Sequence, residues 1–265
     1  FEYYNINKTS PDNVSNNWVN AITKDHQGNI WFSTRSALNK FTLKTEVFST
    51  YRHNLDDSDS LGSRGIQAIT EDSQNNLWVG TANGLDYFLP KTAKFRTYQH
   101  SEVNLNSLSH NHVLAITEDN QKNLWVATVE GLNYFNPKTE VFTHYRHDMT
   151  QPNSLSHNYI SSIALDDEGN LWVGTMNGLN LMDMKSGAFV RFTEEDGLPD
   201  STIYAIEIDE QGYLWISTNQ GLSQFNPKSK TFKNYDVADG LQSNEFNAGA
   251  SYKSDSGELF FGGIN

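Results

Sequence analysis

The stretch LWVGTANGL, residues 77–85, decides the fold of this chain of 265 residues. It predicts two short strands on either side of an Asn83–Gly84 turn, because Asn-Gly is the strongest short-range hairpin signature. The stretches LWVATVEGL at 124–132 and LWVGTMNGL at 171–179 repeat it at intervals of 47 residues. Such spacing is typical of a repeat architecture, so the strands predicted for one unit are expected in every unit.

The repeat extends to both ends of the chain. Its marker is an aromatic residue in the second predicted strand of each unit, which recurs as Trp31, Trp78, Trp125, Trp172, Trp215 and Phe260. Within one unit, alternating apolar residues and turn residues predict four strands: 66–70, 77–81, 85–88 and 94–98. Four short antiparallel strands in about 47 residues form one blade of a β-propeller. No segment has the periodicity of a helix.

The sequence therefore predicts an all-β fold, a β-propeller of four-stranded antiparallel blades in a single domain over residues 1–265. Five complete blades and a partial sixth are expected at 14–53, 61–100, 108–147, 155–192, 198–235 and 243–265. Phe1 and Tyr4 match the pair Phe48 and Tyr51 of a fourth strand. Residues 1–4 are thus predicted as the last strand of a preceding or closing blade, and the chain as part of a larger, possibly seven-bladed, array.

Composition excludes several classes of protein. The chain has 19 basic and 32 acidic residues, a formal net charge of −13, so nucleic acid and anionic membrane surfaces are disfavoured partners. It has no cysteine, and hence no disulfide, thiolate metal site or cysteine nucleophile. No run of 18 apolar residues occurs, so no contact with the membrane core is expected from this segment.

Four segments carry a resemblance to a known repeat. They are NHVLAITED at 111–119, NLWVAT at 123–128, GLNYFNP at 131–137 and DGLQSNEFN at 239–247. The first three resemble the bacterial two-component regulator propeller repeat, and the fourth is similar to the terminal repeat of that family. The resemblance covers about the whole chain.

This resemblance implies a role. Repeats of this family form the extracytoplasmic sensor of hybrid histidine kinases and of some membrane-bound diguanylate cyclases. It implies a periplasmic part of an inner-membrane protein, a small-molecule or oligosaccharide ligand, and a possible homodimer formed through the full-length protein. No kinase or cyclase motif is present, so the chain is not expected to be an enzyme, and no cofactor is expected.

The candidate ligand site lies on one face of the propeller. There the loop between successive blades meets the turn between the second and third strands of a blade, and the residues differ from one repeat to the next. The ligand-binding candidates are Trp18, Arg35, Arg64, His112, Glu130 and Tyr159. Aromatic rings of this kind stack on sugars, and an arginine can fork onto the carboxylate or sulfate of an acidic sugar. No catalytic or metal-ligating residue is predicted.

Two other functions stay open. One is a protein-interaction propeller without a small ligand. The other is a propeller lyase of the streptogramin-inactivating type, in which His112 and Glu130 would act as an acid–base pair with a metal. The turns of the form Asp-x-x-Gly, such as 166–169, resemble calcium loops but are interpreted as hairpin turns. The histidines at 53, 100 and 147 recur in register, which favours a structural role.

Overall fold

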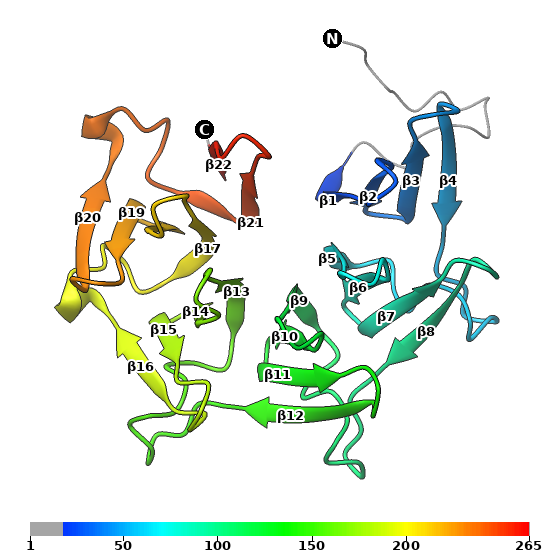
Figure 1. Ribbon diagram of the computed structural model, residues 1–265, viewed down its shortest axis with the longest axis horizontal. Coiled ribbons are helices and arrows are strands. Elements are labelled where there is room, and N and C mark those ends of the chain that lie inside the picture. Colours follow the sequence, from blue (N-terminus) through cyan, green and yellow to red (C-terminus); the bar gives the residue numbers. More distant parts are fainter. Residues whose placement is uncertain (1–17, 265) are drawn as a thin grey trace. The chain divides into compact units, whose positions relative to one another are not determined.

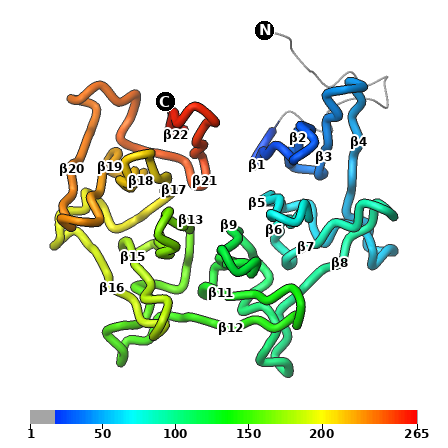
Figure 2. Tube along the Cα trace, viewed as in Figure 1, coloured from blue at the N-terminus to red at the C-terminus, as the bar shows by residue number. Residues whose placement is uncertain are grey.

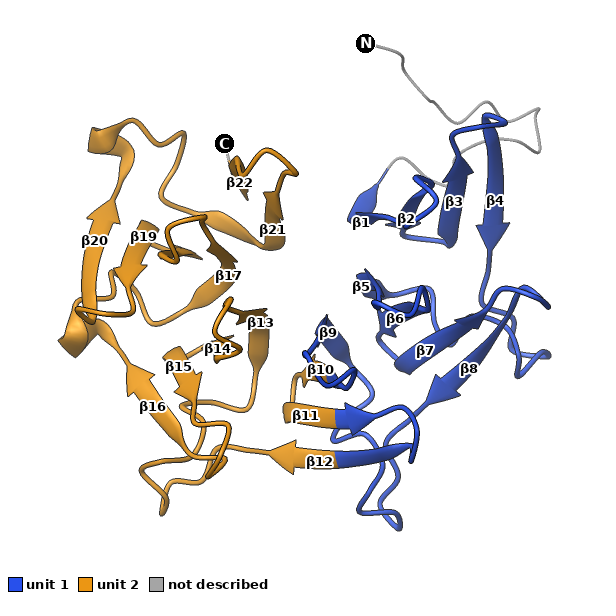
Figure 3. Ribbon diagram, viewed as in Figure 1, with its two compact units in different colours: residues 1–124, 135–142 blue, residues 125–134, 143–265 orange. Residues whose placement is uncertain are grey.

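The computed structural model describes residues 18–264 as a succession of short antiparallel strands (Figure 1). The chain divides into two compact units, residues 1–124 with 135–142 and residues 125–134 with 143–265 (Figure 3). The boundary passes through the third sheet along the chain. The strand predicted at residues 1–4 lies outside the described residues.

The first two blades lie in the first unit and the third crosses the boundary. Their strands are β1 (Val19–Lys24), β2 (Ile30–Thr34), β3 (Leu38–Thr42), β4 (Val47–Tyr51), β5 (Ile66–Glu71), β6 (Leu77–Thr81), β7 (Gly84–Leu89), β8 (Lys94–Tyr98), β9 (Val113–Glu118), β10 (Leu124–Thr128), β11 (Gly131–Asn136) and β12 (Val141–Tyr145).

The remaining blades lie in the second unit. Their strands are β13 (Ile160–Leu165), β14 (Leu171–Thr175), β15 (Gly178–Met182), β16 (Phe189–Phe192), β17 (Ile203–Ile208), β18 (Leu214–Thr218), β19 (Gly221–Asn226), β20 (Thr231–Tyr235), β21 (Phe246–Lys253) and β22 (Leu259–Gly263). Two 3-10 turns, η1 (Glu194–Asp196) and η2 (Val237–Asp239), occupy the shortened loops after β16 and β20. The sequence did not predict them, because a single turn of helix is too short to show periodicity.

Every sheet pairs its strands in chain order, which confirms the predicted blade. Among the described residues there are five four-stranded sheets and one two-stranded sheet, β21–β22. The tube in Figure 2 follows this meander. We call the four strands of a blade a, b, c and d. The Asn83–Gly84 turn between b and c forms as predicted, with Gly84 at φ 134°, where an added Cβ would collide with the carbonyl oxygen of Tyr98.

This strand order gives each blade two ends. The d–a loops that link successive blades and the b–c turns lie at one end, which we call the loop face. The a–b and c–d turns lie at the opposite end, which we call the turn face. Within each unit the a strands of successive blades are neighbours: β1, β5 and β9 in the first unit, and β13, β17 and β21 in the second.

The repeated tryptophans form the core between blades. Trp31 meets Phe88 of the next blade edge-on, with ring centroids 5.2 Å apart, and Trp172 meets Phe225 in the same way at 5.6 Å. The indoles of both tryptophans are buried. Because each blade contributes one such ring, burial of the b strands holds neighbouring blades together.

An aspartate holds four of these rings, those of Trp31, Trp78, Trp172 and Trp215, to their own a–b turns. In the second blade the Asp72 carboxylate accepts hydrogen bonds from the backbone N–H groups of Gln74 and Asn76 and from the indole Nε1 of Trp78, the last at 2.8 Å. The same indole bond joins Trp31 to Asp25, Trp172 to Asp166 and Trp215 to Asp209. These are the turns that superficially resemble calcium loops, and their carboxylates are occupied by the turn itself.

Candidate ligand-binding face

The d–a loops are latched by a histidine at their base. Nδ1 of His53, His100 and His147 lies 2.7, 2.7 and 2.6 Å from the carbonyl oxygens of Leu61, Leu108 and Leu155, eight residues further along the chain. A serine Oγ inside each loop also accepts a backbone N–H, as Ser107 does from Ser101 at 2.9 Å. The structural role predicted for these histidines is confirmed.

The loops rest on the b–c turns. In the second blade the N–H of Ala82 donates to the carbonyl oxygen of Gly65 at 2.7 Å, and Asn83 Nδ2 donates to that of Gly62 at 3.1 Å. In the second unit the N–H of Gly178 donates to the carbonyl oxygen of Ser201 at 2.7 Å. Loop and turn therefore form one surface, as expected from the sequence.

Trp18 and Arg35 come together on this face of the first unit. The guanidinium carbon of Arg35 lies 4.0 Å from the centroid of the Trp18 indole, a cation–π contact. Trp18 precedes β1 and is 56% exposed, while Arg35 belongs to the b–c turn between β2 and β3. The guanidinium covers one face of the indole, so the pair combines exposed aromatic surface with a positive charge.

Arg64 precedes β5 and is exposed. It occupies the register of Asn111 and Asn158 in the next two blades, whose side-chain oxygens accept the N–H of His100 and His147 at 2.6 and 2.7 Å. Arginine carries no acceptor and cannot make this bond. The substitution therefore gives the loop face an exposed positive charge where the other two blades have a loop-fixing amide.

His112 precedes β9 and is half-buried. Burial, together with the nearby His110, lowers the pKa of His112, so its ring is neutral at pH 7. Among the described residues its buried Nε2 has no hydrogen-bond partner. A neutral imidazole with a free nitrogen is suited to hydrogen-bond a hydroxyl group.

Glu130 and Tyr159 belong to the second unit. Glu130 is exposed in the turn between β10 and β11, and its carbonyl oxygen accepts from Nε of Arg146 at 3.1 Å. Tyr159 is half-buried before β13, and its N–H donates to Nδ1 of His157 at 2.9 Å. Because His112 and Glu130 belong to different units, the acid–base pair of the lyase hypothesis stays a prediction. Within the described residues no group of three or more His, Asp or Glu side chains gathers to hold a metal ion.

Sequence reasoning missed one buried carboxyl group. Asp86 on β7 is fully buried and stands in the register of Asn39, Asn133 and Asn180 of other blades. Burial raises the pKa of Asp86 to about 6, although Thr97, Gly62 and His53 act in the other direction. Alignment of the repeats could have revealed the exchange of an amide for a carboxyl, but the alignment carries no measure of burial.

The comparison with known families agrees with this architecture. The profile described as "Two component regulator propeller" matches residues 13–36, 60–83, 107–130, 154–177 and 197–220. The chain carries two component regulator propeller repeats. Each matched repeat includes strands a and b and ends in the b–c turn, and the four matches from residue 60 onward also begin in a d–a loop, so the matches contain the loop-face residues described above.

Solved structures extend the comparison. The extracellular domain of BT3049 from B. thetaiotaomicron, assigned as a hybrid two component system, covers 94% of this chain with 28% identity and a TM-score of 0.78. The extracellular domain of BT4673 from the same organism covers 92% with 21% identity and a TM-score of 0.64. This chain spans 32% and 40% of those two chains. A comparison with curated protein sequences gives no match.

An enzyme also shares the fold. Virginiamycin B lyase from Staphylococcus aureus covers 95% of this chain with 17% identity and a TM-score of 0.69. At that identity the likeness concerns the fold alone. The all-β propeller architecture built from repeats is therefore established, and the choice between sensor and enzyme rests on the chemistry of the site. No helix long and apolar enough to cross a membrane occurs between residues 18 and 264.

Proposed function

We propose that this chain is the ligand-sensing propeller of an extracytoplasmic signalling protein and that its ligand is an acidic carbohydrate fragment. The Trp18–Arg35 pair is the observation that carries the proposal. A sugar ring stacks on an aromatic surface, and a guanidinium beside that surface binds a carboxylate or sulfate through two hydrogen bonds. The resemblance to extracellular domains of hybrid two component systems supports the signalling role and the location outside the cytoplasm.

The loop face also explains why a ligand could be bound selectively. Its backbone is fixed by the histidine latches and by the bonds between loops and b–c turns. Its side chains vary from blade to blade, as Trp18, Gly65 and His112 do at one register position of three successive blades. A rigid backbone that carries variable side chains lowers the entropy lost on binding.

A thermal-shift titration tests the proposal. The chain is mixed with a panel of neutral and acidic oligosaccharides, and a ligand at 100 times its Kd should add about 2.7 kcal/mol of stability. Acidic members should stabilise and their neutral counterparts should not. Trp18→Ala and Arg35→Gln should each remove the effect, while Arg96→Gln, which removes an exposed charge paired with Glu140 outside the loop face, should keep it. If an acidic oligosaccharide stabilises Arg35→Gln as much as it stabilises the unmodified chain, Arg35 does not bind the ligand and the proposed site is wrong.

A second candidate function is a platform for protein interaction. The loop tips of the first unit expose large apolar side chains: Leu55 is 90% exposed, Val103 95% and Leu105 85%. If these tips mediate self-association, as in a homodimer of the full-length protein, replacing all three with serine should abolish the concentration-dependent mass increase in sedimentation velocity. A chain that stays monomeric at all concentrations argues against self-association through this segment.

A further inference from the structure

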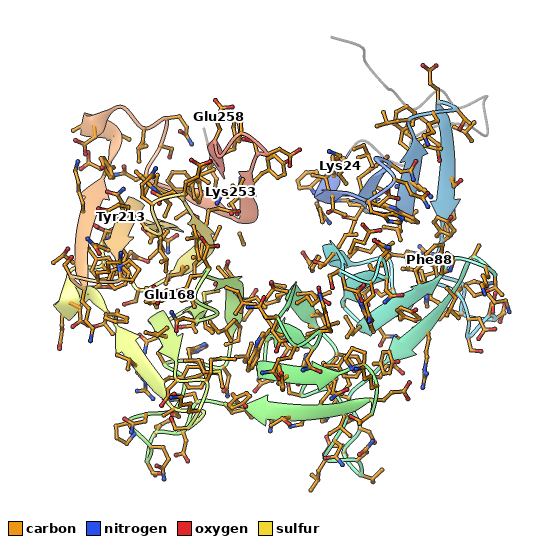
Figure 4. All side chains as sticks on the ribbon, viewed as in Figure 1. Lys24, Phe88, Glu168, Tyr213, Lys253 and Glu258 are labelled. Atoms are coloured by element: carbon orange, nitrogen blue, oxygen red, sulfur yellow. The ribbon has the colours of Figure 1, made fainter. Side chains whose placement is uncertain are left out.

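A cavity of about 400 Å³ lies on the turn face of the second unit, between the fourth and fifth blades along the chain. Three turns form its walls: the a–b turn of each blade and the c–d turn after β19. Figure 4 labels Glu168 and Tyr213, which line the cavity from the two a–b turns. The cavity lies at the end of the blades opposite the loop face, so it is a separate site.

Two junctions of the first unit show a hydrogen bond that spans the corresponding space. At the junction of the first two blades, the Glu71 carboxylate at the end of strand a accepts the N–H of His26 in the preceding a–b turn at 2.6 Å. At the next junction Glu118 accepts the N–H of Ser73 at 2.8 Å. We call this bond the glutamate clamp.

The fourth and fifth blades lack the clamp. Ile208 stands at the end of β17 in the position of Glu71 and Glu118, and Asp167 stands in the position of Ser73. Ile208 lines the cavity, and its side chain contains no hydrogen-bond acceptor. The backbone N–H of Asp167, an exposed turn residue, therefore lacks the glutamate acceptor that His26 and Ser73 have.

A second replacement enlarges the same space. In the second blade Tyr87, which pairs with Trp78 in register, donates its hydroxyl to Oδ1 of Asn76 at 2.9 Å. In the fourth blade the register partner of Trp172 is Leu181, which has no hydroxyl. Nδ2 of Asn170 still donates to Asp166, but its Oδ1 lacks the tyrosine donor that Asn76 has in the second blade. The cavity thus contains a backbone donor and an amide acceptor that lack the partners of their counterparts, above apolar side chains.

The charges of the rim define the occupant further. Asp167 and Glu168 are exposed at the rim, opposed by the single cation Lys228. Asp166 is occupied by its bonds to the turn and to Trp172, and the carboxylate of Glu210 lies against Gly257 of the next blade. Two carboxylates against one ammonium give a net negative rim, which attracts a cation.

We propose that this cavity binds a small polyhydroxylated amine of the amino sugar class. The ammonium group lies between the carboxylates of Asp167 and Glu168. Ring hydroxyls accept from the Asp167 N–H and donate to Oδ1 of Asn170, and the apolar face of the ring packs on Leu181, Ile208 and Tyr213. A neutral sugar lacks the charge, and a simple cationic amino acid lacks the hydroxyl groups. The proposal is independent of the ligand at the loop face.

Amide chemical shifts of the 15N-labelled chain provide the test, with glucosamine, glucose, N-acetylglucosamine and L-lysine as probes. Glucosamine should shift the amide resonances of residues 167–170 and 208–213 in a saturable manner. Glucose and N-acetylglucosamine should bind about tenfold more weakly or not at all, which corresponds to about 1.4 kcal/mol. Binding of glucose equal to that of glucosamine overturns the role of charge, and binding of L-lysine equal to that of glucosamine overturns the role of the hydroxyl groups.

Two kinds of variant complete the test. Leu181→Tyr restores the phenol of the second blade and Ile208→Glu restores the clamp, so each should abolish the glucosamine shifts without loss of stability. Met176→Tyr, which adds the same phenol on the opposite turn of the fourth blade, should bind as the unmodified chain does. The paired change of Asp167→Asn and Glu168→Gln leaves the cavity volume intact and should weaken glucosamine binding about tenfold. Glucosamine shifts that persist in Leu181→Tyr would overturn the proposal, whatever the loop face binds.

Discussion

Asp86 should make the stability of this chain depend on pH, and Asp86→Asn should remove that dependence. Its Oδ2 accepts the N–H of Gly62 at 2.7 Å, whereas its buried Oδ1 has no partner among the described residues. Asn180, in the same register of the fourth blade, accepts the N–H of Ser156 at 2.9 Å and donates Nδ2 to the carbonyl oxygen of Val173 at 3.2 Å. The register partner of Asp86 is Val79, so an asparagine at 86 would gain the equivalent bond.

The change in the free energy of unfolding follows from the pKa of Asp86. Burial raises the pKa of Asp86 from 3.8 to about 6, so between these values the folded chain binds more protons than the unfolded chain. Stability therefore falls as the pH rises through this window and is lowest above it. The difference between the two pKa values corresponds to about 3 kcal/mol, which is the largest expected gain from Asp86→Asn at pH 7.5. At pH 4 the gain should be under about 1 kcal/mol, since Asp86 is then protonated in the folded state and the unfolded chain has only begun to lose that proton.

Urea denaturation at pH 4, 5, 6 and 7.5 measures this difference. Other groups also titrate, including Glu207, whose pKa burial raises, so the free energies of the unmodified chain and the variant are compared at each pH. Asn180→Asp is the matched control, because it places the same carboxyl in the fourth blade and should introduce a decline of stability with pH. Parallel curves for the unmodified chain and Asp86→Asn from pH 4 to 7.5 would refute the reasoning.

Three further predictions concern the scaffold. Trp125→Ala, which removes a ring with 1% exposure, should lower the free energy of unfolding by about 3–5 kcal/mol in urea denaturation, and an unchanged value would contradict the blade assignment. Asp72→Ala should cost about 2–3 kcal/mol in the same assay, because it leaves the buried indole N–H of Trp78 without its acceptor; a loss typical of a surface site would exclude that role. His100→Ala should cost about 1 kcal/mol and speed hydrogen exchange of the amides at 101–107, whereas unchanged exchange would show that the latch does not order the loop.

The sequence predicted the blades well because their pairing is local. Each strand pairs with the next one along the chain, so alternation and turn residues were sufficient to place β5, β6, β7 and β8 within one or two residues. The repeat also distinguished structural from variable positions. The histidine latches confirm that inference, since one bond recurs in three loops.

The ligand candidates and the turn-face cavity depend on neighbours that the sequence does not pair. The contact of Trp18 with Arg35 joins residues 17 positions apart in different parts of a blade, and only the folded sheet brings them to 4.0 Å. Leu181 and Ile208 belong to different blades, and each is an ordinary apolar strand residue by itself. Their effect appears only when this junction is compared with that of the second and third blades, where Tyr87 and Glu118 make hydrogen bonds. Whether a donor has a partner depends on the neighbouring blade and not on the residue itself.

The latched loops have a consequence for protein engineering. The histidine and serine bonds of each loop close within nine residues, at 53–61, 100–108 and 147–155, and they are the same in all three. The ends of each loop are therefore held in the same geometry as long as the serine is kept. Such loops can be exchanged for one another. For example, the segment 101–107 could be grafted between His53 and Leu61 without redesign of the sheet. A chain of this kind offers a scaffold on which new loop sequences can be displayed at defined positions.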